Sequence, residues 1–323
     1  MTFNLLDQYN NVYMASILIT GGTGLIGSHL QHFLVGRGYS VIVLERDDAK
    51  DKPSSPGITY AKWNVEKGGI DKTAVASADY IIHLAGANVA AKRWTNKRKK
   101  EIVESRTKSG ELIVRSLKEI PNKIKAVISA SAIGWYGADT TESKRNGFKE
   151  DAPAANDFLG NTCKLWEASI QPVEKLYKRL CILRFGIVLS EKGGALEEFK
   201  KPLKFGIAAI LGNGNQVISW IHIDDVCRLL LFAVEHSTIS GIYNAVAPKP
   251  VSNKALTLML AQQMRGKLFL PAYAPGFALK MMLGEMSIEV LKSATVNDAK
   301  IKNAGFSFLY PSIEAAVENL VKQ

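Results

Sequence analysis

The chain has 323 residues, of which 47% are hydrophobic and 22% are charged, which is typical of globular proteins rather than disordered or fibrous ones. This length suits one large domain or two unequal domains with a substantial core. The formal net charge is +11, but the basic residues are dispersed except for the run at 97–100, which we interpret as a solvated helix face. We therefore expect no nucleic-acid partner, and the positive excess helps to attract an anionic cofactor.

The spacing of the cysteines and the character of the N-terminus limit the possible classes of protein further. Cys163, Cys181 and Cys227 have neither metal-ligand nor disulfide-framework spacing, so we expect a cytoplasmic protein without a metal site. Residues 1–13 lack the features of a signal peptide and are predicted to be a flexible arm. The sequence contains no apolar run of about 18 residues, so we expect no membrane span.

The clearest pattern in the chain is a buried strand, a glycine turn and the start of a helix at 17–30. This order is typical of dinucleotide-binding folds. Gly21 permits the tight turn, Gly24 lets the backbone approach a pyrophosphate, and Gly27 lets the helix pack closely on the sheet. Free N–H groups at the helix start would face the phosphates. The predicted cofactor loop therefore contains Gly21, Thr23, Gly24, Leu25, Ile26 and Gly27.

A second apolar strand at 40–44 ends in Glu45 and Arg46, close to the position expected for the group that meets the adenosine ribose. A carboxylate favours a free 2′-hydroxyl, whereas a guanidinium favours a 2′-phosphate, so both cofactors stay open. We favour NADP over NAD because Arg46 can contact a phosphate with two N–H groups. A third strand at 58–63 leads to Asn64 and Val65, which either bracket an adenine edge or cap the strand end.

The next two strands are expected to end at the nicotinamide. The fourth, within 78–88, exits through Leu84, Ala85 and Gly86, whose small side chains let the backbone lie against the cofactor. A long helix over 107–119 follows a basic and helical stretch. The fifth strand, 126–129, runs towards Ser131 and Tyr136, the predicted catalytic residues, because hydroxyls at a central strand end can hydrogen-bond a substrate oxygen.

The rest of the chain completes an α/β, Rossmann-like, doubly wound parallel sheet with a smaller C-terminal α/β substrate domain. We predict a loop over 138–156, a helix over 158–178 that is interrupted near Pro172, and a sixth strand over 180–189. A helix at 226–236 and a strand at 242–246 follow. The expected cofactor domain is 14–190 with 217–246, and the substrate-side domain is 191–216 with 247–323. The remaining predicted cofactor contacts lie on the central strands and are Ser129, Arg184 and Phe185.

Several of these segments together resemble the extended short-chain dehydrogenase/reductases. Residues 20–27 look like the family's glycine motif, and residues 83–86 look like its fourth-strand signature. Residues 129–137, 158–160, 219–225 and 304–308 resemble more narrowly an atypical, epimerase-like branch that carries a small C-terminal domain of unknown function. The resemblance implies NADP(H) binding, with the 2′-phosphate on Arg46, and epimerase or dehydratase chemistry. Ser131 matches the catalytic Ser/Thr position, with Ala132 as a competing alignment.

Two departures from the family pattern bear on the chemistry. Typical members use a Tyr-x-x-x-Lys pair for proton transfer, and alignment on Glu167 puts Leu159 and Cys163 at those two positions. Other candidate proton donors, in order of preference, are Tyr136, Ser131, Glu167 and His222. In addition, Ile218 stands where nucleotide-sugar epimerases place a diphosphate-binding arginine, which makes a nucleotide sugar a weaker candidate substrate.

Two functions follow from this pattern. The first is an NADP-dependent oxidoreductase or epimerase-like enzyme that acts on a small carbonyl or hydroxyl compound as a monomer or homodimer. The second is an NADP(H)-binding sensor or scaffold with little or no turnover, because the Tyr-x-x-x-Lys pair is missing and a fold alone does not define an activity.

Overall fold

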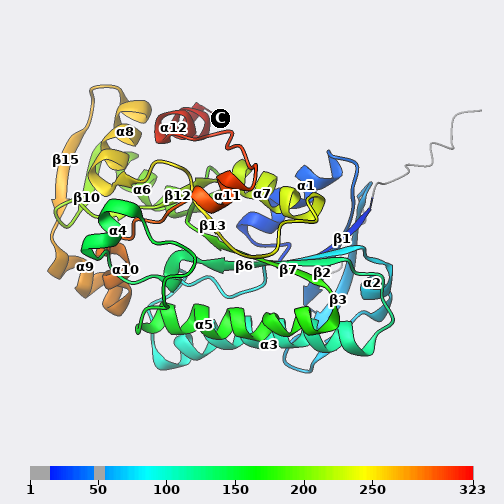
Figure 1. The fold of residues 1–323 in the computed structure, drawn as a ribbon. Helices are drawn as coiled ribbons and strands as arrows, with labels where there is room; N and C mark the ends of the chain where they lie inside the picture. Colours follow the sequence, from blue (N-terminus) through cyan, green and yellow to red (C-terminus); the bar gives the residue numbers. More distant parts are fainter. Residues whose placement is uncertain (1–14, 47–54, 323) are drawn as a thin grey trace, which may run out of the picture.

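The computed structural model describes residues 15–46 and 55–322. The predicted N-terminal arm lies outside these residues. Eight strands form the main sheet in the order β13-β7-β6-β5-β1-β2-β3-β4 (Figure 1). All neighbours are parallel except β4, which pairs antiparallel with β3. The strands are β1 (Ser16–Thr20), β2 (Ser40–Arg46), β3 (Ile58–Asn64), β4 (Gly69–Ile70), β5 (Tyr80–His83), β6 (Ala126–Ala132), β7 (Arg179–Phe185) and β13 (Gly241–Ala245).

Helices cover both faces of this sheet, as the expected doubly wound arrangement requires. Figure 1 shows α1 (Leu25–Val35) and α7 (Ile223–Glu235) above it and α3 (Asn96–Glu119) and α5 (Phe158–Ile170) below it. Alternate residues of β1 point to opposite faces, so Ile17 and Ile19 pack with Leu30 of α1, whereas Leu18 packs with Leu112 of α3. Burial on both faces explains why the strands are continuously apolar.

The strand order reverses between β1 and β5, and this is where the cofactor was expected. From β1 the chain proceeds outward through β2 and β3, then returns to place β5 on the other side of β1. In such open sheets, ligands bind in the crevice at the carboxyl ends of the strands beside the reversal. The β1–α1 corner and the exit of β5 meet at this position.

A second, smaller set of elements packs beside the main sheet. Three small sheets are formed by β12 (Trp220–His222), β8 (Ile187–Ser190) and β9 (Gly193–Gly194), by β10 (Ile207–Leu211) with β15 (Leu270–Ala274), and by β11 (Val217–Ile218) with β14 (Val251–Ser252). Their helices are α6 (Ala195–Leu203), α8 (Asn253–Arg265), α9 (Gly276–Leu283), α10 (Ser287–Leu291), α11 (Ala299–Asn303) and α12 (Ile313–Lys322).

The hydrophobic clusters join segments from both sides of the expected domain boundaries. Leu189 and Trp220, assigned to the cofactor part, pack in a separate cluster with Leu196 and Leu260. Phe306, assigned to the substrate side, packs with α7 in the cluster above the main sheet. The division into two domains stays a prediction.

Several predicted elements differ from the observed ones. The strand expected over 180–189 divides at Gly186, because β7 stays in the main sheet while β8 pairs with β12. A Cβ at Gly186 would lie 2.7 Å from the carbonyl oxygen of Ser219, so only glycine allows this departure. Short helices, α2 (Lys72–Ser77) and α4 (Thr141–Asn146), were missed, and 3-10 turns form at η1 (Ile133–Trp135), η2 (Gln171–Leu176) and η3 (Gly284–Met286).

The basic run at 97–100 lies in the first turn of α3, and its residues have different environments. Lys100 is exposed and pairs with Glu104, as a solvated face predicts. Arg98 is instead buried and donates a hydrogen bond to the carbonyl of Asn88, and Lys99 pairs with Glu285 of η3. The run therefore connects the loop after β5 with the C-terminal elements, which the composition alone did not indicate.

Within the described ranges 15–46 and 55–322, no helix is both long and apolar enough to cross a membrane. The same ranges contain no group of three or more His, Cys, Asp or Glu side chains arranged to hold a metal ion. Cys163, Cys181 and Cys227 are all free and buried.

Candidate cofactor and active site

The β1–α1 corner requires glycine at two of its predicted positions. Gly21 has a φ of +69°, and a Cβ there would lie 2.8 Å from the carbonyl carbon of Leu84. A Cβ on Gly27 would lie 2.3 Å from the Gly21 carbonyl oxygen and 2.6 Å from the Gly22 Cα. Any side chain at either position would push the β1 turn away from α1 or from the exit of β5, so the corner keeps its shape only with glycine.

The N-terminus of α1 is available to an anion. Gly24 caps the helix without a side-chain hydrogen bond, and the first turn contains no acidic residue. Thr23 and Gly24 are exposed, while Leu25 and Ile26 are half-buried. Uncapped N–H groups together with the positive end of the helix dipole favour a phosphate at this position. The residues predicted for the cofactor loop therefore form a cradle that fits a pyrophosphate.

Thr20 and His83 tie this corner to the end of β5. Thr20 Oγ1 accepts hydrogen bonds from the backbone N–H of Leu84 at 3.1 Å and of Ala85 at 3.2 Å. Because both lone pairs are used, the Thr20 hydroxyl donates to His83 Nδ1 at 2.7 Å, which leaves the proton of the neutral imidazole on Nε2. Burial lowers the pKa of His83 to about 3. His83 is therefore a buried, neutral imidazole that links the end of β5 to β1, which favours a structural role over catalysis.

The two charged residues at the end of β2 differ in accessibility. The Glu45 side chain is buried, whereas Arg46 is exposed. They also point to opposite faces because they are consecutive in a strand. At the end of β3, Asn64 Oδ1 accepts from the backbone N–H of Lys67 at 2.9 Å, and Val65 packs on the lower core. The side-chain oxygen of Asn64 thus caps the end of β3, and an adenine contact by Asn64 and Val65 stays a prediction.

The loop that follows β5 is exposed at Gly86 and is supported by the side chain of Arg106. Gly86 is exposed, Leu84 is half-buried and Ala85 is buried. A Cβ on Gly86 would lie 3.1 Å from Cζ of Arg106, whose guanidinium donates to the Ala87 carbonyl at 3.0 Å. Burial lowers the pKa of Arg106 to about 10. Arg106 therefore packs against this loop and holds it by a hydrogen bond, while Gly86 remains exposed.

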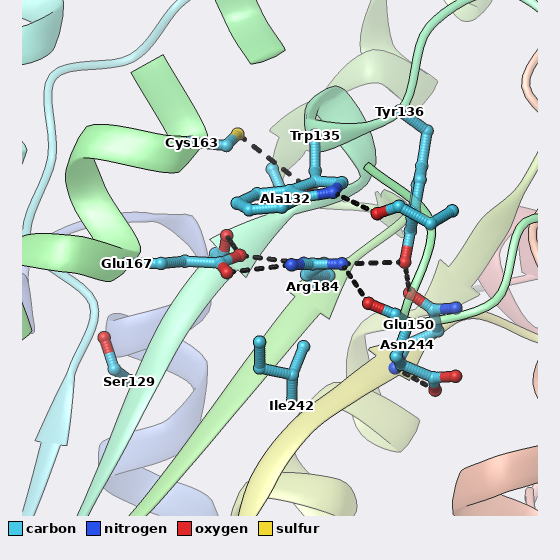
Figure 2. A network of polar contacts seen from close by, with 12 residues as sticks. Ser129, Ala132, Trp135, Tyr136, Glu150, Cys163, Glu167, Arg184, Ile242 and Asn244 are labelled. Atoms are coloured by element: carbon cyan, nitrogen blue, oxygen red, sulfur yellow. Dashed lines mark hydrogen bonds and ion pairs between the residues drawn. The ribbon is translucent and has the colours of Figure 1, made fainter. Parts of the chain in front are cut away.

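A buried polar network connects the ends of β6 and β7, and Figure 2 shows its members. Arg184 forms an ion pair with Glu167 through two bonds, at 2.8 Å from Nε to Oε1 and 2.9 Å from Nη2 to Oε2. Ser131 donates to Glu167 Oε1 at 2.6 Å. The Arg184 guanidinium also stacks 3.7 Å from the centre of the Trp135 ring. Ser131 and Arg184 are both buried, so this network holds them within the protein interior.

Tyr136 lies at the other end of this network. Its side chain is 0% exposed. The hydroxyl donates to Asn244 Oδ1 at 2.7 Å and accepts from Arg184 Nη1 at 3.0 Å (Figure 2). Burial raises the pKa of Tyr136 to about 12. A covered phenol with two protein partners and a raised pKa is poorly suited to exchange a proton with a substrate, so this geometry favours a structural role.

The other strand-end residues are also enclosed. Ser129 is fully buried and donates to the Ala130 carbonyl at 3.2 Å, and Phe185 packs in the upper core. His222 is buried too, and its Nε2 lies 3.1 Å from Asn319 Oδ1 while Nδ1 accepts from the N–H of Asp224. The structure thus brings Ser131, Tyr136 and Arg184 together but leaves His222 in a separate network at the start of α7.

Leu159 and Cys163 on α5 face the end of β6. A Cβ on Gly134 would lie 3.2 Å from Leu159 Cβ and 3.7 Å from Cys163 Sγ. Cys163 Sγ lies 3.7 Å from the Ala132 carbonyl oxygen, and burial raises the pKa of the thiol to about 12. An aliphatic side chain and a neutral thiol therefore occupy the positions that alignment gave to the tyrosine and lysine.

Sequence reasoning missed the partners that complete these networks. Asn244 on β13 and Glu150 in the loop before α5 both contribute, since Glu150 Oε1 accepts from the Asn244 backbone N–H at 2.8 Å and its carbonyl accepts from Arg184 at 3.0 Å. Nothing in the local sequence around 150 or 244 indicated this role. The contacts join residues that are far apart in the chain.

Two family profiles match the chain over most of its length. The NAD dependent epimerase/dehydratase family matches residues 17–245, and a domain of unknown function matches residues 274–320. The epimerase family protein YfhF of Bacillus subtilis strain 168 is 34% identical over 306 residues, which cover 95% of this chain and 98% of YfhF.

Solved structures resemble the fold across nearly the whole chain. The crystal structure of the human epimerase family protein SDR39U1 with NADPH has a TM-score of 0.82 and 26% identity, and the match covers 95% of this chain and 99% of that one. A UDP-glucuronic acid 4-epimerase variant from Bacillus cereus in complex with NAD has a TM-score of 0.74, covering 95% of this chain and 99% of that one. At 20% identity, the latter similarity concerns the fold alone.

Proposed function

Because this chain belongs to the NAD-dependent epimerase/dehydratase family, we propose that it binds NADP(H) and acts as an epimerase-like oxidoreductase on a small carbonyl or hydroxyl compound. The observation that carries the proposal is the β1–α1 corner, where glycine is required at Gly21 and Gly27 and the helix N-terminus lacks a side-chain cap. That corner suits a pyrophosphate, and the adjacent strand ends suit a nicotinamide. When bound, the cofactor supplies or accepts a hydride.

The preference for NADP(H) is based on the end of β2. Arg46 is exposed where a 2′-phosphate is expected, and the Glu45 carboxylate that would favour a free 2′-hydroxyl is buried. The structure of human SDR39U1, 26% identical to this chain, contains NADPH.

Calorimetric titration with NADPH and NADH tests this proposal. We expect Arg46→Gln to weaken NADPH binding by about 10- to 100-fold, because one charge-assisted phosphate contact contributes about 1.5–3 kcal/mol. NADH binding should change less than about two-fold, since NADH has no 2′-phosphate. Arg145→Gln, at an exposed position of α4, is the matched control and should affect neither ligand. Absence of heat with both dinucleotides would exclude the proposed cofactor site.

A second candidate function, binding without appreciable turnover, is favoured by a specific observation. Leu159 and the buried thiol of Cys163 lie where the family pattern has a proton-transferring pair, and neither is suited to that chemistry at neutral pH. In this reading the protein senses or sequesters NADP(H). A screen of carbonyl compounds for NADPH oxidation separates the two candidates, since sustained turnover of any of them excludes a purely binding role.

Ser131 and Tyr136, the predicted catalytic residues, have a structural role in this proposal. We propose that they belong to the network that holds the end of β6 in place, through Glu167 for Ser131 and through Arg184 for Tyr136. In that role they shape the floor of the site and do not exchange protons. We propose that the protein acts on a small molecule and has no nucleic-acid partner.

A further inference from the structure

The exposed apolar side chains of this protein gather on the small C-terminal set of elements. Among the described residues, most of the large hydrophobic side chains that are exposed belong to the range 205–288. Four of them lie where α6 leads into β10 and where β15 begins, namely Phe205, Ile207, Leu268 and Leu270. A continuous apolar surface of this kind marks a contact with another molecule more often than a free surface.

Strand pairing brings these four side chains together. Ile207 lies directly opposite Leu270 in the parallel pairing of β10 with β15. Phe205 and Leu268 each stand two positions earlier in the chain, and they are 85% and 83% exposed. Ala208, the next residue of β10, points to the other side and is buried in the cluster that contains α8. One side of this small sheet therefore packs on the protein, whereas the side with Ile207 and Leu270 is exposed.

The helix that follows β15 is also apolar on its outer side. Lys280 is the one polar residue of α9. Leu279 is buried and faces the protein, yet Phe277 and Met281, which are neighbours one turn apart, are 73% and 70% exposed. A helix that is apolar on all sides is normally buried. The outer side of α9 therefore has the character of a contact surface.

These elements occupy one end of the molecule. In Figure 1, β10, β15 and α9 lie at the left edge, and α2 lies at the opposite end. The surface formed by the exposed apolar side chains of these elements is called the end face below. Its members are Phe205, Ile207, Leu268, Leu270, Phe277 and Met281.

The charged residues around the end face are mainly cations. The segments 200–212 and 262–283 contain six basic residues and no acidic residue. Glu197, which precedes the first segment, pairs with Lys204 at 2.9 Å. Within the described ranges, neither Lys267 nor Lys280 pairs with a carboxylate. Three exposed lysines directly precede an exposed apolar residue, and these pairs are Lys204-Phe205, Lys267-Leu268 and Lys280-Met281.

This combination of apolar and basic side chains fits the surface of an anionic membrane. Apolar side chains enter the boundary between headgroups and acyl chains, while adjacent lysines extend to the anionic headgroups. A second copy of the chain fits less well, because a symmetric contact would place the same basic surface opposite itself. Nucleic acid would attract the lysines but would leave the aliphatic side chains exposed.

We propose that the end face binds the surface of membranes that are rich in anionic lipids. The protein lies on the bilayer in this arrangement, in agreement with the absence of a membrane-spanning helix from residues 15–46 and 55–322. The inference does not depend on the proposed cofactor or substrate.

Sedimentation of the full chain with sucrose-loaded vesicles tests this proposal. The vesicles consist of phosphatidylcholine alone or of an equal mixture of phosphatidylcholine and phosphatidylglycerol. We expect binding to the mixed vesicles to be at least about ten-fold stronger, because only these carry negative charge. Added sodium chloride should weaken this binding, since salt screens the attraction between lysines and headgroups.

Removal of two unpaired lysines should weaken binding to the mixed vesicles. Lys267→Gln combined with Lys280→Gln is expected to reduce affinity by about 30-fold, because each cation near an anionic surface contributes about five-fold. The matched control combines Lys72→Gln with Lys118→Gln. It removes the same charge at exposed positions of α2 and α3, and it should keep the affinity within about two-fold.

Removal of apolar side chains tests insertion into the bilayer. Phe277→Gln combined with Met281→Gln should weaken vesicle binding by about ten-fold or more, because two apolar groups no longer leave water. Leu165→Gln combined with Tyr177→Gln, at exposed positions of α5 and after η2, is the control and should bind as the parent does. All of these side chains are exposed, so thermal midpoints and calorimetric NADPH affinity should stay unchanged.

The proposal is wrong if neither kind of vesicle binds the parent protein, or if the two lysine variants lose equal affinity. Vesicle binding that survives Phe277→Gln with Met281→Gln would also contradict it. Sedimentation velocity examines the second copy as an occupant. A dimer that this variant disperses, in a protein that binds no vesicles, would assign the end face to a second copy. Failure of the cofactor proposal is separate, because it would appear as absent NADPH binding in calorimetry.

Discussion

Glu167 and Arg184 illustrate how individual residues at this site are committed to protein contacts. The guanidinium uses its Nε, Nη1 and Nη2 atoms on Glu167, Tyr136 and the Glu150 carbonyl. A buried ion pair is stable only when hydrogen bonds satisfy both partners. The network therefore holds β6, β7 and α5 in one arrangement, and it commits the Arg184 guanidinium to protein partners, while the cofactor contact of this residue stays a prediction.

Neutralising one partner of this pair should destabilise the protein strongly. Glu167→Gln leaves the Arg184 charge buried without its counter-ion, and we expect a loss of about 3–5 kcal/mol in the free energy of unfolding. Urea denaturation measures this change. The control is Glu198→Gln, which removes an exposed ion pair with Lys201 and should cost less than about 1 kcal/mol. Similar losses in the two variants would contradict the structural role.

His83 should make stability depend on pH. Its folded pKa, about 3, lies below the ordinary value of 6.5, so the unfolded chain binds the proton first as the pH falls. The stabilisation is complete above pH 6.5 and is lost as the pH decreases towards 3. We expect a slope of up to about 1.4 kcal/mol per pH unit from this group. Unfolding free energies between pH 7.5 and 4.5 should show a shallower slope in His83→Gln, and an unchanged slope would refute the assignment.

At the scale of elements, the β1–α1 corner depends on a close approach between backbone segments. The carbonyl oxygen of Gly21 occupies the space where a Gly27 Cβ would stand, and the carbonyl of Leu84 closes the other side. Sequence spacing predicted which glycines the corner needs. The structure adds a second reason for glycine at position 21. The backbone that follows β5 passes so close to the turn that it leaves no room for a side chain.

Gly27→Ala should disturb both folding and cofactor binding. The new methyl group would lie 2.3 Å from a backbone oxygen, and overpacking of this kind costs about 1–3 kcal/mol. We also expect NADPH affinity to fall by about ten-fold or more, because the N–H groups move away from the phosphate position. Gly69→Ala, where a Cβ would meet nothing within 4 Å, should leave calorimetric affinity and the unfolding midpoint close to those of the parent.

At the scale of the whole molecule, the C-terminal segment returns to pack against the large sheet and its helices. Asp225 at the start of α7 is completely buried and accepts from the N–H groups of Leu309 and Tyr310 at 2.7 and 2.8 Å. Ser219 holds the strand-like stretch before α11 in a similar way, through Ala294 and Val296. These contacts connect the C-terminal stretch at 294–310 with the β11–β12 region and the start of α7.

Removal of the Asp225 carboxylate should loosen this connection. Asp225→Ala leaves two backbone N–H groups without their acceptor, and we expect a loss of about 2–4 kcal/mol. Limited proteolysis should also become faster between 307 and 312. Asp151→Ala, at an exposed position, is the control and should change stability by less than about 0.5 kcal/mol. Unaltered cleavage in Asp225→Ala would show that the segment is held by other contacts.

Local patterns sufficed for much of the fold and for the cofactor corner. Apolar runs of strand length, the glycine spacing at 21–27 and the alternation of strands with helices are short-range features, and they correctly indicated a doubly wound sheet. They failed where neighbours in space determine the structure. The strand at 180–189 divides because Ser219, more than 30 positions away, approaches Gly186, and no local periodicity records that contact.

Roles of polar residues depended on long-range packing for the same reason. The sequence showed that Ser131 and Tyr136 follow a central strand, but their hydrogen-bond partners come from α5, β7 and β13. Asp157, which lies more than 130 positions before Lys292, forms an ion pair with it only in the folded chain. Hydrogen bonds and burial act between groups that meet in space, so the accessibility of a hydroxyl or an amine becomes defined only when distant segments have packed together.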